Sequence, residues 1–84
     1  SVMFAVAFAG MAIVGCQAQR NLDLVRTMGD RHAANGEYER ALVDYQEYIA
    51  RKPDGVDVRY SMARALLGAG RPQEAREQFY QCLA

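Results

Sequence analysis

The feature that most constrains the fold of this chain is an internal repeat at a constant offset of 34 residues. Apolar, small and aromatic residues recur in the same order at this offset. The recurring pairs are Leu22 and Val56, Met28 and Met62, Gly36 and Gly70, Ala41 and Ala75, Tyr45 and Phe79, and Ile49 and Leu83. A fixed period near this length is typical of a solenoid, in which each repeat is one unit stacked on the next. The sequence therefore predicts two units, residues 22–55 and 56–84.

Each unit is expected to contain two helices. Apolar and small residues fall at helical spacing in both parts of the first unit: Val25, Met28, Gly29 and His32, then Tyr38, Ala41, Leu42, Tyr45 and Ile49. Gly36 and Gly70 can adopt the left-handed conformation that ends a helix, and Pro72 suits the first turn of the next one. A turn at residues 53–55 separates the units. We predict helices over residues 22–35, 38–52, 56–69 and 72–83, and hence an all-α fold.

This pattern resembles the tetratricopeptide repeat, whose signature is W-x2-L-G-x2-Y, then A-x3-F, then P. Unit one reads Val25-x2-Met28-Gly29-x2-His32, Ala41-x3-Tyr45 and Pro53, and unit two reads Arg59-x2-Met62-Ala63-x2-Leu66 and Ala75-x3-Phe79. The resemblance covers residues 22–84. The departures are Arg59 at a bulky apolar position, His32 and Leu66 for Tyr, and Tyr48 at a small position. The resemblance implies a TPR-like solenoid of antiparallel helix pairs, and the departures put only its crossing angles in doubt.

The same packing follows from the residues themselves. Gly29, Ala41, Ala63 and Ala75 allow two helix backbones to approach closely, and Tyr45 and Phe79 are expected to fill the space between the paired helices. Cys82 is in phase with Tyr48 and is expected to be a small core residue.

The resemblance also implies where a partner would bind, because in such arrays the first helix of each unit lines a concave face. The positions opposite its packed stripe are Asp23, Arg26, Asp30 and Ala34 in unit one, and Asp57, Tyr60, Arg64 and Gly68 in unit two. They form a face of alternating charge with one aromatic residue, suited to an extended or helical peptide. The alternative is that Arg26 pairs with Asp30, and Asp57 with Arg64, as solvated surface charges.

The first residues differ from the rest of the chain. Residues 2–16 carry no polar side chain and are followed by Gln17, Gln19 and Arg20. Residues 1–15 suit the h-region of a signal peptide, truncated at its start, with residues 16–21 as a short linker. Ile13-Val14-Gly15-Cys16 resembles the lipobox of bacterial lipoproteins, which implies that Cys16 carries the lipid anchor. The alternative is an uncleaved anchor or a buried apolar N-terminal helix. Gln17 after the Cys implies, by the same resemblance, the outer membrane and a periplasmic location.

Other functional classes find little support. The ten basic and ten acidic residues balance, so the basic excess that nucleic-acid binding needs is missing. No phosphate loop, metal-ligand pattern or activated nucleophile is recognisable, so we expect no catalysis, metal or cofactor. The lone His32 falls on a packed stripe, and Glu37, Glu39, Asp44 and Glu47 are most simply a solvated face. Cys16 and Cys82 indicate neither a zinc site nor a disulfide framework.

Two repeats bury too little for a solenoid, which usually needs three or more. The last helix carries Phe79, Tyr80, Cys82 and Leu83 with nothing following to cover them. We expect either a further repeat beyond Ala84 or a homo-oligomer that covers this edge. The function expected overall is a membrane-anchored adaptor that organises envelope proteins, for example in pilus, secretion or envelope assembly. The alternatives are a regulatory or targeting region of a larger enzyme and a structural oligomerisation module.

Overall fold

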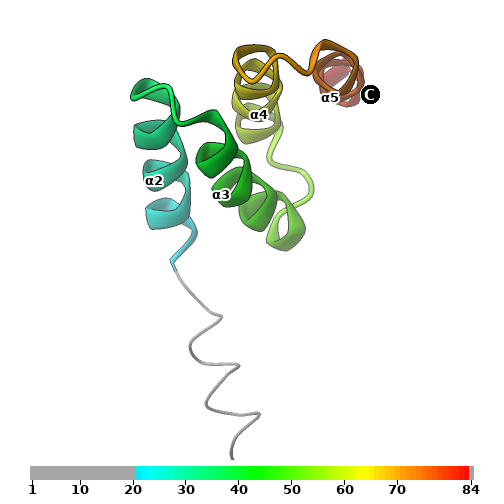
Figure 1. Ribbon diagram of the computed structural model, residues 1–84. Coiled ribbons are helices and arrows are strands. Elements are labelled where there is room, and N and C mark those ends of the chain that lie inside the picture. The colour runs from blue at the N-terminus through cyan, green and yellow to red at the C-terminus, as the bar shows by residue number, and fades with distance from the viewer. Residues whose placement is uncertain (1–20, 84) are drawn as a thin grey trace, which may run out of the picture.

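The computed structural model describes residues 21–83, and they form an all-α arrangement of four helices. Their bounds are Leu22–Ala34 for α2, Tyr38–Arg51 for α3, Val56–Gly68 for α4 and Pro72–Leu83 for α5. Each helix packs on the next in the chain, and α3 lies between α2 and α4 (Figure 1). None of these helices is long and apolar enough to cross a membrane. The expected N-terminal apolar helix and Cys16 lie outside the described residues.

The two predicted glycine turns are confirmed. The turn has the same geometry in both units. Gly36 and Gly70 have φ values of 76° and 77°. After α2, the N–H of Glu37 donates a hydrogen bond to the carbonyl oxygen of His32 at 2.8 Å. After α4, the N–H of Arg71 donates in the same way to the carbonyl oxygen of Leu66 at 2.9 Å. These bonds satisfy carbonyls that would otherwise be unpaired at the helix ends. Pro72 then opens α5, where its missing N–H costs nothing.

The core lies along the seams between consecutive helices, as the repeat predicts. Its most deeply buried members are small or compact: Val25, Ala41, Val58, Ala63 and Ala75 have no exposed surface. Tyr45 is the largest of the almost completely buried side chains, at 2% exposure, whereas its counterpart Phe79 is half-buried. Burying one large apolar side chain contributes about 1.5–3 kcal/mol to the free energy of unfolding. Because most of the deeply buried residues are small, the stability of these seams depends on a few larger side chains.

Close approach at glycines makes room for the two buried tyrosine rings of α3. A Cβ at Gly29 would lie 2.6 Å from the Tyr45 ring, and one at Gly55 would lie 2.8 Å from the Tyr48 ring. Tyr48 occupies a position where a small residue was expected, and it is nevertheless buried, at 5% exposure. The missing side chain of Gly55 therefore compensates for the bulk of Tyr48.

One prediction about α3 is wrong. Asp44 was expected on a solvated face, but it is buried at 6% exposure, and its Oδ2 lies 2.8 Å from Nδ1 of His32 on α2. The stripe of α3 that packs on α2 and α4 is wider than its apolar residues indicate, because a carboxylate can be buried when a partner satisfies it. Cys82, expected in the core, is half-buried, with its Sγ 3.7 Å from the carbonyl oxygen of Val56.

Charged contacts join the units. Arg71, in the turn before α5, reaches back to Glu39 on α3 at 3.2 Å while it also pairs with Glu74 at 2.7 Å. A further contact joins α2 to α4 and belongs to the face described next.

Candidate functional site

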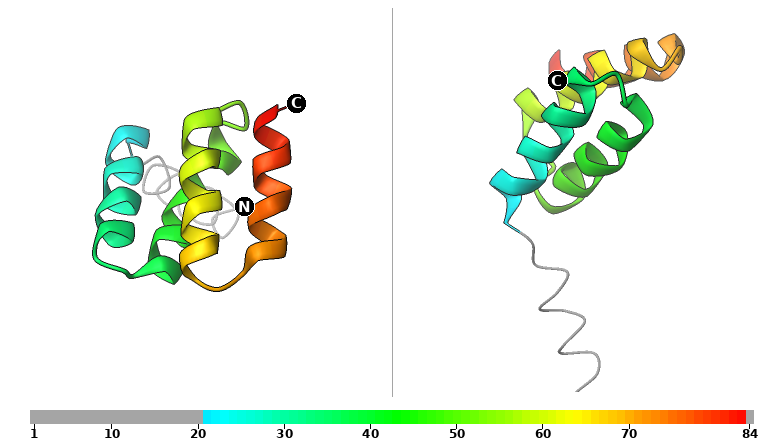
Figure 2. Two further views of the ribbon diagram at one scale, coloured as in Figure 1. Left: turned by 90° about the horizontal axis from the view of Figure 1, so that it is seen from above. Right: turned by 60° about the vertical axis from the view of Figure 1, so that its left-hand side comes forward.

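The helices α2 and α4 lie side by side with α3 behind them, so together they form one face of the molecule (Figure 2, left). All eight positions predicted from the sequence lie on these two helices. Seven of them are exposed and Arg26 is half-buried: Asp23, Arg26, Asp30 and Ala34 on α2, and Asp57, Tyr60, Arg64 and Gly68 on α4. Whether these residues bind a partner stays a prediction.

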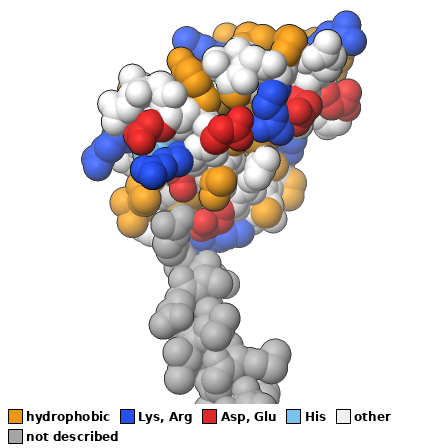
Figure 3. Space-filling model, in the orientation of Figure 1, with side chains coloured by type: hydrophobic (Ala, Val, Ile, Leu, Met, Phe, Trp, Pro, Cys, Tyr) orange, Lys and Arg blue, Asp and Glu red, His pale blue; other side chains and the backbone are white. Residues whose placement is uncertain are grey.

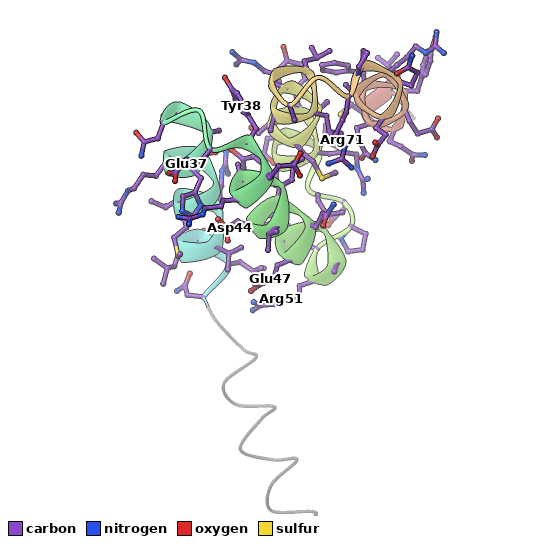
Figure 4. The ribbon with its side chains drawn as sticks, in the orientation of Figure 1. Glu37, Tyr38, Asp44, Glu47, Arg51 and Arg71 are labelled. Carbon is purple, nitrogen blue, oxygen red and sulfur yellow. The ribbon has the colours of Figure 1, made fainter. Side chains whose placement is uncertain are left out.

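A hollow of about 330 Å³ lies on this face between α2, the start of α3, and α4. It brings together three predicted positions from both units. The residues lining it are Asp30, Ala33, Ala34, Tyr38, Tyr45, Ser61, Arg64 and Ala65. Tyr38 projects from the first turn of α3 toward the space between α2 and α4 (Figure 4). We call this the α2/α4 hollow.

Asp30 is fixed in the α2/α4 hollow by the core. Its Oδ1 accepts a hydrogen bond from the Tyr45 hydroxyl at 2.6 Å. Burial, with this bond and the nearby negative charge of Asp30, raises the pKa of Tyr45 well above its ordinary value. The phenol therefore stays a donor, and one oxygen of Asp30 is committed to the fold.

Arg64 contrasts with Asp30, because its side chain is exposed and forms neither an ion pair nor a hydrogen bond with any of residues 21–83. Its guanidinium can therefore meet an incoming acceptor without first breaking an internal bond. A planar guanidinium with several N–H donors suits a carboxylate or a peptide carbonyl.

The charge pairs proposed as the alternative, Arg26 with Asp30 and Asp57 with Arg64, are both wrong. The Nη1 of Arg26 lies 2.8 Å from Oδ2 of Asp57 on α4, so Arg26 pairs between the units and not within α2. Asp30 is bonded to Tyr45 instead. Arg26 and Asp57 are therefore neighbours on the face because the units stack, a relation that spacing along one helix does not reveal.

A second hollow, wider and more open, lies where α4 begins. It spans about 780 Å³ and is lined by Arg26, Asp54, Val56, Asp57, Tyr60, Ser61 and Cys82. The Tyr60 ring packs edge-on against Phe79 of α5, with centroids 5.5 Å apart at 64°. We call this the α4-entry hollow. Of the predicted positions, Asp23 and Gly68 line neither hollow, although a Cβ at Gly68 would lie 2.5 Å from the Tyr38 ring.

Sequence reasoning missed other residues that line the two hollows, among them Tyr38, Asp54 and Ser61. It confined the face to one stripe of the first helix in each unit, whereas Tyr38 starts the second helix and Asp54 lies in the turn between units. The place of Tyr38 and Asp54 beside the turns at Gly36 and Gly55 is the signal that could have found them, because chain reversals bring the ends of neighbouring helices together. Ser61 lies within α4, three residues before Arg64.

A third hollow, of about 550 Å³, lies away from this face, between α3 and α5. None of the residues that line it was predicted as a binding position. Its lining is Leu42, Gln46, Ile49, Ala50, Arg59, Met62, Leu66, Glu74, Glu77 and Gln78. Leu42, Met62 and Leu66 are each at most 6% exposed, yet the accessible lining of this α3/α5 hollow is more apolar than polar. Arg59 lies here because its guanidinium donates to Gln78 at 3.0 Å and to the carbonyl of Pro53 at 2.9 Å.

Within residues 21–83, no group of three His, Cys, Asp or Glu side chains is placed to hold a metal ion. His32 contacts Asp44 and belongs to the α2–α3 seam. The surface in view mixes acidic and basic side chains without a field of one sign (Figure 3).

Comparison with known families agrees with this architecture. A family model described as a tetratricopeptide repeat matches residues 26–83, which is more than half of the chain. No curated protein and no solved structure gives a significant match.

Proposed function

The chain belongs to the tetratricopeptide repeat family, and from this premise we propose that it is a non-catalytic scaffold that holds a segment of a partner protein on the face of α2 and α4. Repeats of this family serve protein interaction. The observation that carries the proposal is the α2/α4 hollow, where both units contribute to one site and Arg64 has no partner among the described residues. The equal numbers of basic and acidic residues favour a protein partner over nucleic acid.

The residues proposed to contact the partner are Asp23, Arg26, Asp30, Asp57, Tyr60 and Arg64. Their roles differ. Arg64 and Tyr60 are free to bind, because one is an unpaired cation and the other a ring with 51% of its surface exposed. Asp30 and Arg26 hold the shape of the face through Tyr45 and Asp57.

We also propose that the scaffold is an envelope lipoprotein anchored through Cys16, facing the periplasm and more consistent with the outer than the inner membrane. The support is the sequence Ile13-Val14-Gly15-Cys16 after an apolar run, followed by Gln17. Such an anchor would keep the interaction face near complexes under assembly, such as pilus, secretion or envelope-biogenesis machines. Mass spectrometry of protein isolated from its membrane tests this proposal. Acyl mass on Cys16 is expected, and a free thiol there would overturn it.

Selection of peptides from a random library on the immobilised full chain tests the scaffold itself. Selected peptides are expected to bind the wild type. Their affinity for the Arg64→Glu variant should be roughly tenfold lower, since a favourable charge contact becomes a repulsive one. Arg76→Glu is the matched control, because Arg76 is exposed on α5 and has no ion pair within the described part. Equal binding to all three proteins would reject this face as the site, provided that circular dichroism shows equal helicity.

A further inference from the structure

The two hollows of the α2/α4 face adjoin, since Ser61 lines both. They differ in the charged group that is left without an internal contact. In the α2/α4 hollow this group is the guanidinium of Arg64, whereas the carboxylate of Asp30, which keeps its charge, accepts a hydrogen bond from Tyr45. In the α4-entry hollow, Arg26 and Asp57 offset one another, and the carboxylate of Asp54 forms no ion pair or hydrogen bond with residues 21–83. Arg64 in one hollow can therefore take up an anionic group, and Asp54 in its neighbour a cationic one.

The α4-entry hollow also suits the stem of a long basic side chain. Val56 and Tyr60 are 52% and 51% exposed, and they are four residues apart, so they lie on one side of α4. The methylene groups of Lys or Arg can cover this apolar pair while the charged end meets Asp54 and Asp57. The Tyr60 ring adds attraction for a cation placed over its face.

The spacing of the two hollows sets a spacing in the partner. Asp57 and Arg64 are seven residues apart on α4, which corresponds to about 10 Å along the helix axis. An extended chain rises about 3.3 Å per residue, so about three residues cover this distance.

We propose that the partner segment is extended and dipolar, with a Lys or Arg in the α4-entry hollow and an Asp or Glu, three residues away, at Arg64. This inference rests on the proposed function and specifies the peptide class that the face accepts. The two opposite charges fix the register of the segment along α4.

Synthetic decapeptides, capped at both ends, test the proposal. Each carries one Lys and one Glu in an otherwise uncharged sequence, separated by one to six positions, and each is titrated into the ¹⁵N-labelled full chain in detergent. The three-position spacing is expected to bind roughly tenfold more tightly than the six-position spacing, with amide shifts at Asp57, Ser61 and Arg64. Peptides with Gln in place of either charge serve as controls and should bind more weakly.

Charge exchange sharpens the test. Arg64→Glu should weaken binding of the Lys/Glu peptide and strengthen binding of a Lys/Lys peptide of the same spacing. Arg76→Glu should change neither affinity. The proposal of a dipolar segment would be overturned by any of three results: an affinity that does not depend on the spacing, amide shifts confined to the α3/α5 hollow, or no binding by any of these peptides. Peptides selected from the random library judge the proposed function separately: if they bind this face without the charge pair, the function stands and this inference fails.

Discussion

The guanidinium of Arg26 on α2 lies 2.8 Å from the carboxylate of Asp57 on α4, so an ion pair joins the two repeat units on the face that carries both hollows. Arg26 and Asp57 therefore contribute to the relative placement of the units as well as to the charge of the face. Arg64 is free of such a structural contact within the described residues. This difference makes Arg64 the cleaner position for testing partner binding.

The Arg26–Asp57 pair is expected to contribute little to stability. Its side chains are 43% and 59% exposed, and exposed ion pairs typically contribute about 0.2–1 kcal/mol. A double-mutant cycle with Arg26→Ala and Asp57→Ala, followed by urea unfolding, should give a coupling energy in that range that shrinks in high salt. A coupling energy well above this range, or one insensitive to salt, would contradict the assignment as a solvated pair.

Gly29 and Gly68 should respond differently to the same substitution. A Cβ at either position would approach a tyrosine ring, at 2.6 Å for Gly29 and 2.5 Å for Gly68. Tyr45, which faces Gly29, is buried and bonded to Asp30, so Gly29→Ala should lower the free energy of unfolding by about 1–3 kcal/mol through overpacking.

Tyr38, which faces Gly68, is half-buried and can rotate toward solvent. Gly68→Ala should therefore change stability by less than about 1 kcal/mol, because the higher helix propensity of Ala offsets the displacement of the ring. Denaturant unfolding of both variants measures the contrast. Equal losses of unfolding free energy in the two variants would show that the mobility of the tyrosine ring does not decide how far the substitution destabilises the fold.

Alkaline pH should destabilise the fold through Tyr45. Its folded-state pKa is raised by burial and by Asp30, whereas in the unfolded chain it titrates near its ordinary value of about 10. Below pH 10 both states keep the proton and stability is complete. Above pH 10 the unfolded state loses the proton first, so the free energy of unfolding should fall by about 1.4 kcal/mol per pH unit from this group.

Tyr45→Phe isolates this effect. The variant should be less stable at neutral pH by about 0.5–1.5 kcal/mol, because the bond to Asp30 is lost. It should, however, lose less stability than the wild type as the pH rises above 10, since the other tyrosines are common to both proteins. Parallel stability curves for the two proteins between pH 8 and pH 11 would contradict a raised pKa for Tyr45.

Asp44 should matter to stability although it is acidic. Asp44→Ala removes the acceptor that lies 2.8 Å from His32 in the α2–α3 seam, and leaving a buried polar group without its partner costs about 1–3 kcal/mol. Glu77→Ala is the control, because Glu77 is exposed and should change stability by no more than about 0.5 kcal/mol. Thermal and urea unfolding compare the two. Equal effects would show that the buried contact contributes nothing.

The helices and their turns were predictable because they depend on local signals. Predicted and observed helix ends differ by at most one residue, and Gly36 and Gly70 have the expected positive φ. The burial of Tyr45 followed from the repeat, since its position faces the partner helix in the unit. These features need only the spacing of residues along the chain.

The contacts between units were not predictable in the same way. Asp44 has the chemistry of a surface residue, and its contact with His32 on α2 is not evident from the spacing of residues along α3. Arg26 has Asp30 one turn away on its own helix, yet it pairs with Asp57, because stacking brings α4 closer to its guanidinium. Helical periodicity gives the direction of a side chain but not which neighbouring element meets it.

The most direct test of the scaffold proposal is site-specific photo-crosslinking of a library-selected peptide to the full chain. A benzophenone side chain would replace Ala34, which is exposed in the α2/α4 hollow, or Val43, which is 65% exposed on α3 and lines none of the three hollows. We predict a crosslink from position 34 that is reduced by Arg64→Glu, and none from position 43. Crosslinking from position 43 alone, or equally from both positions, would contradict binding on the face of α2 and α4.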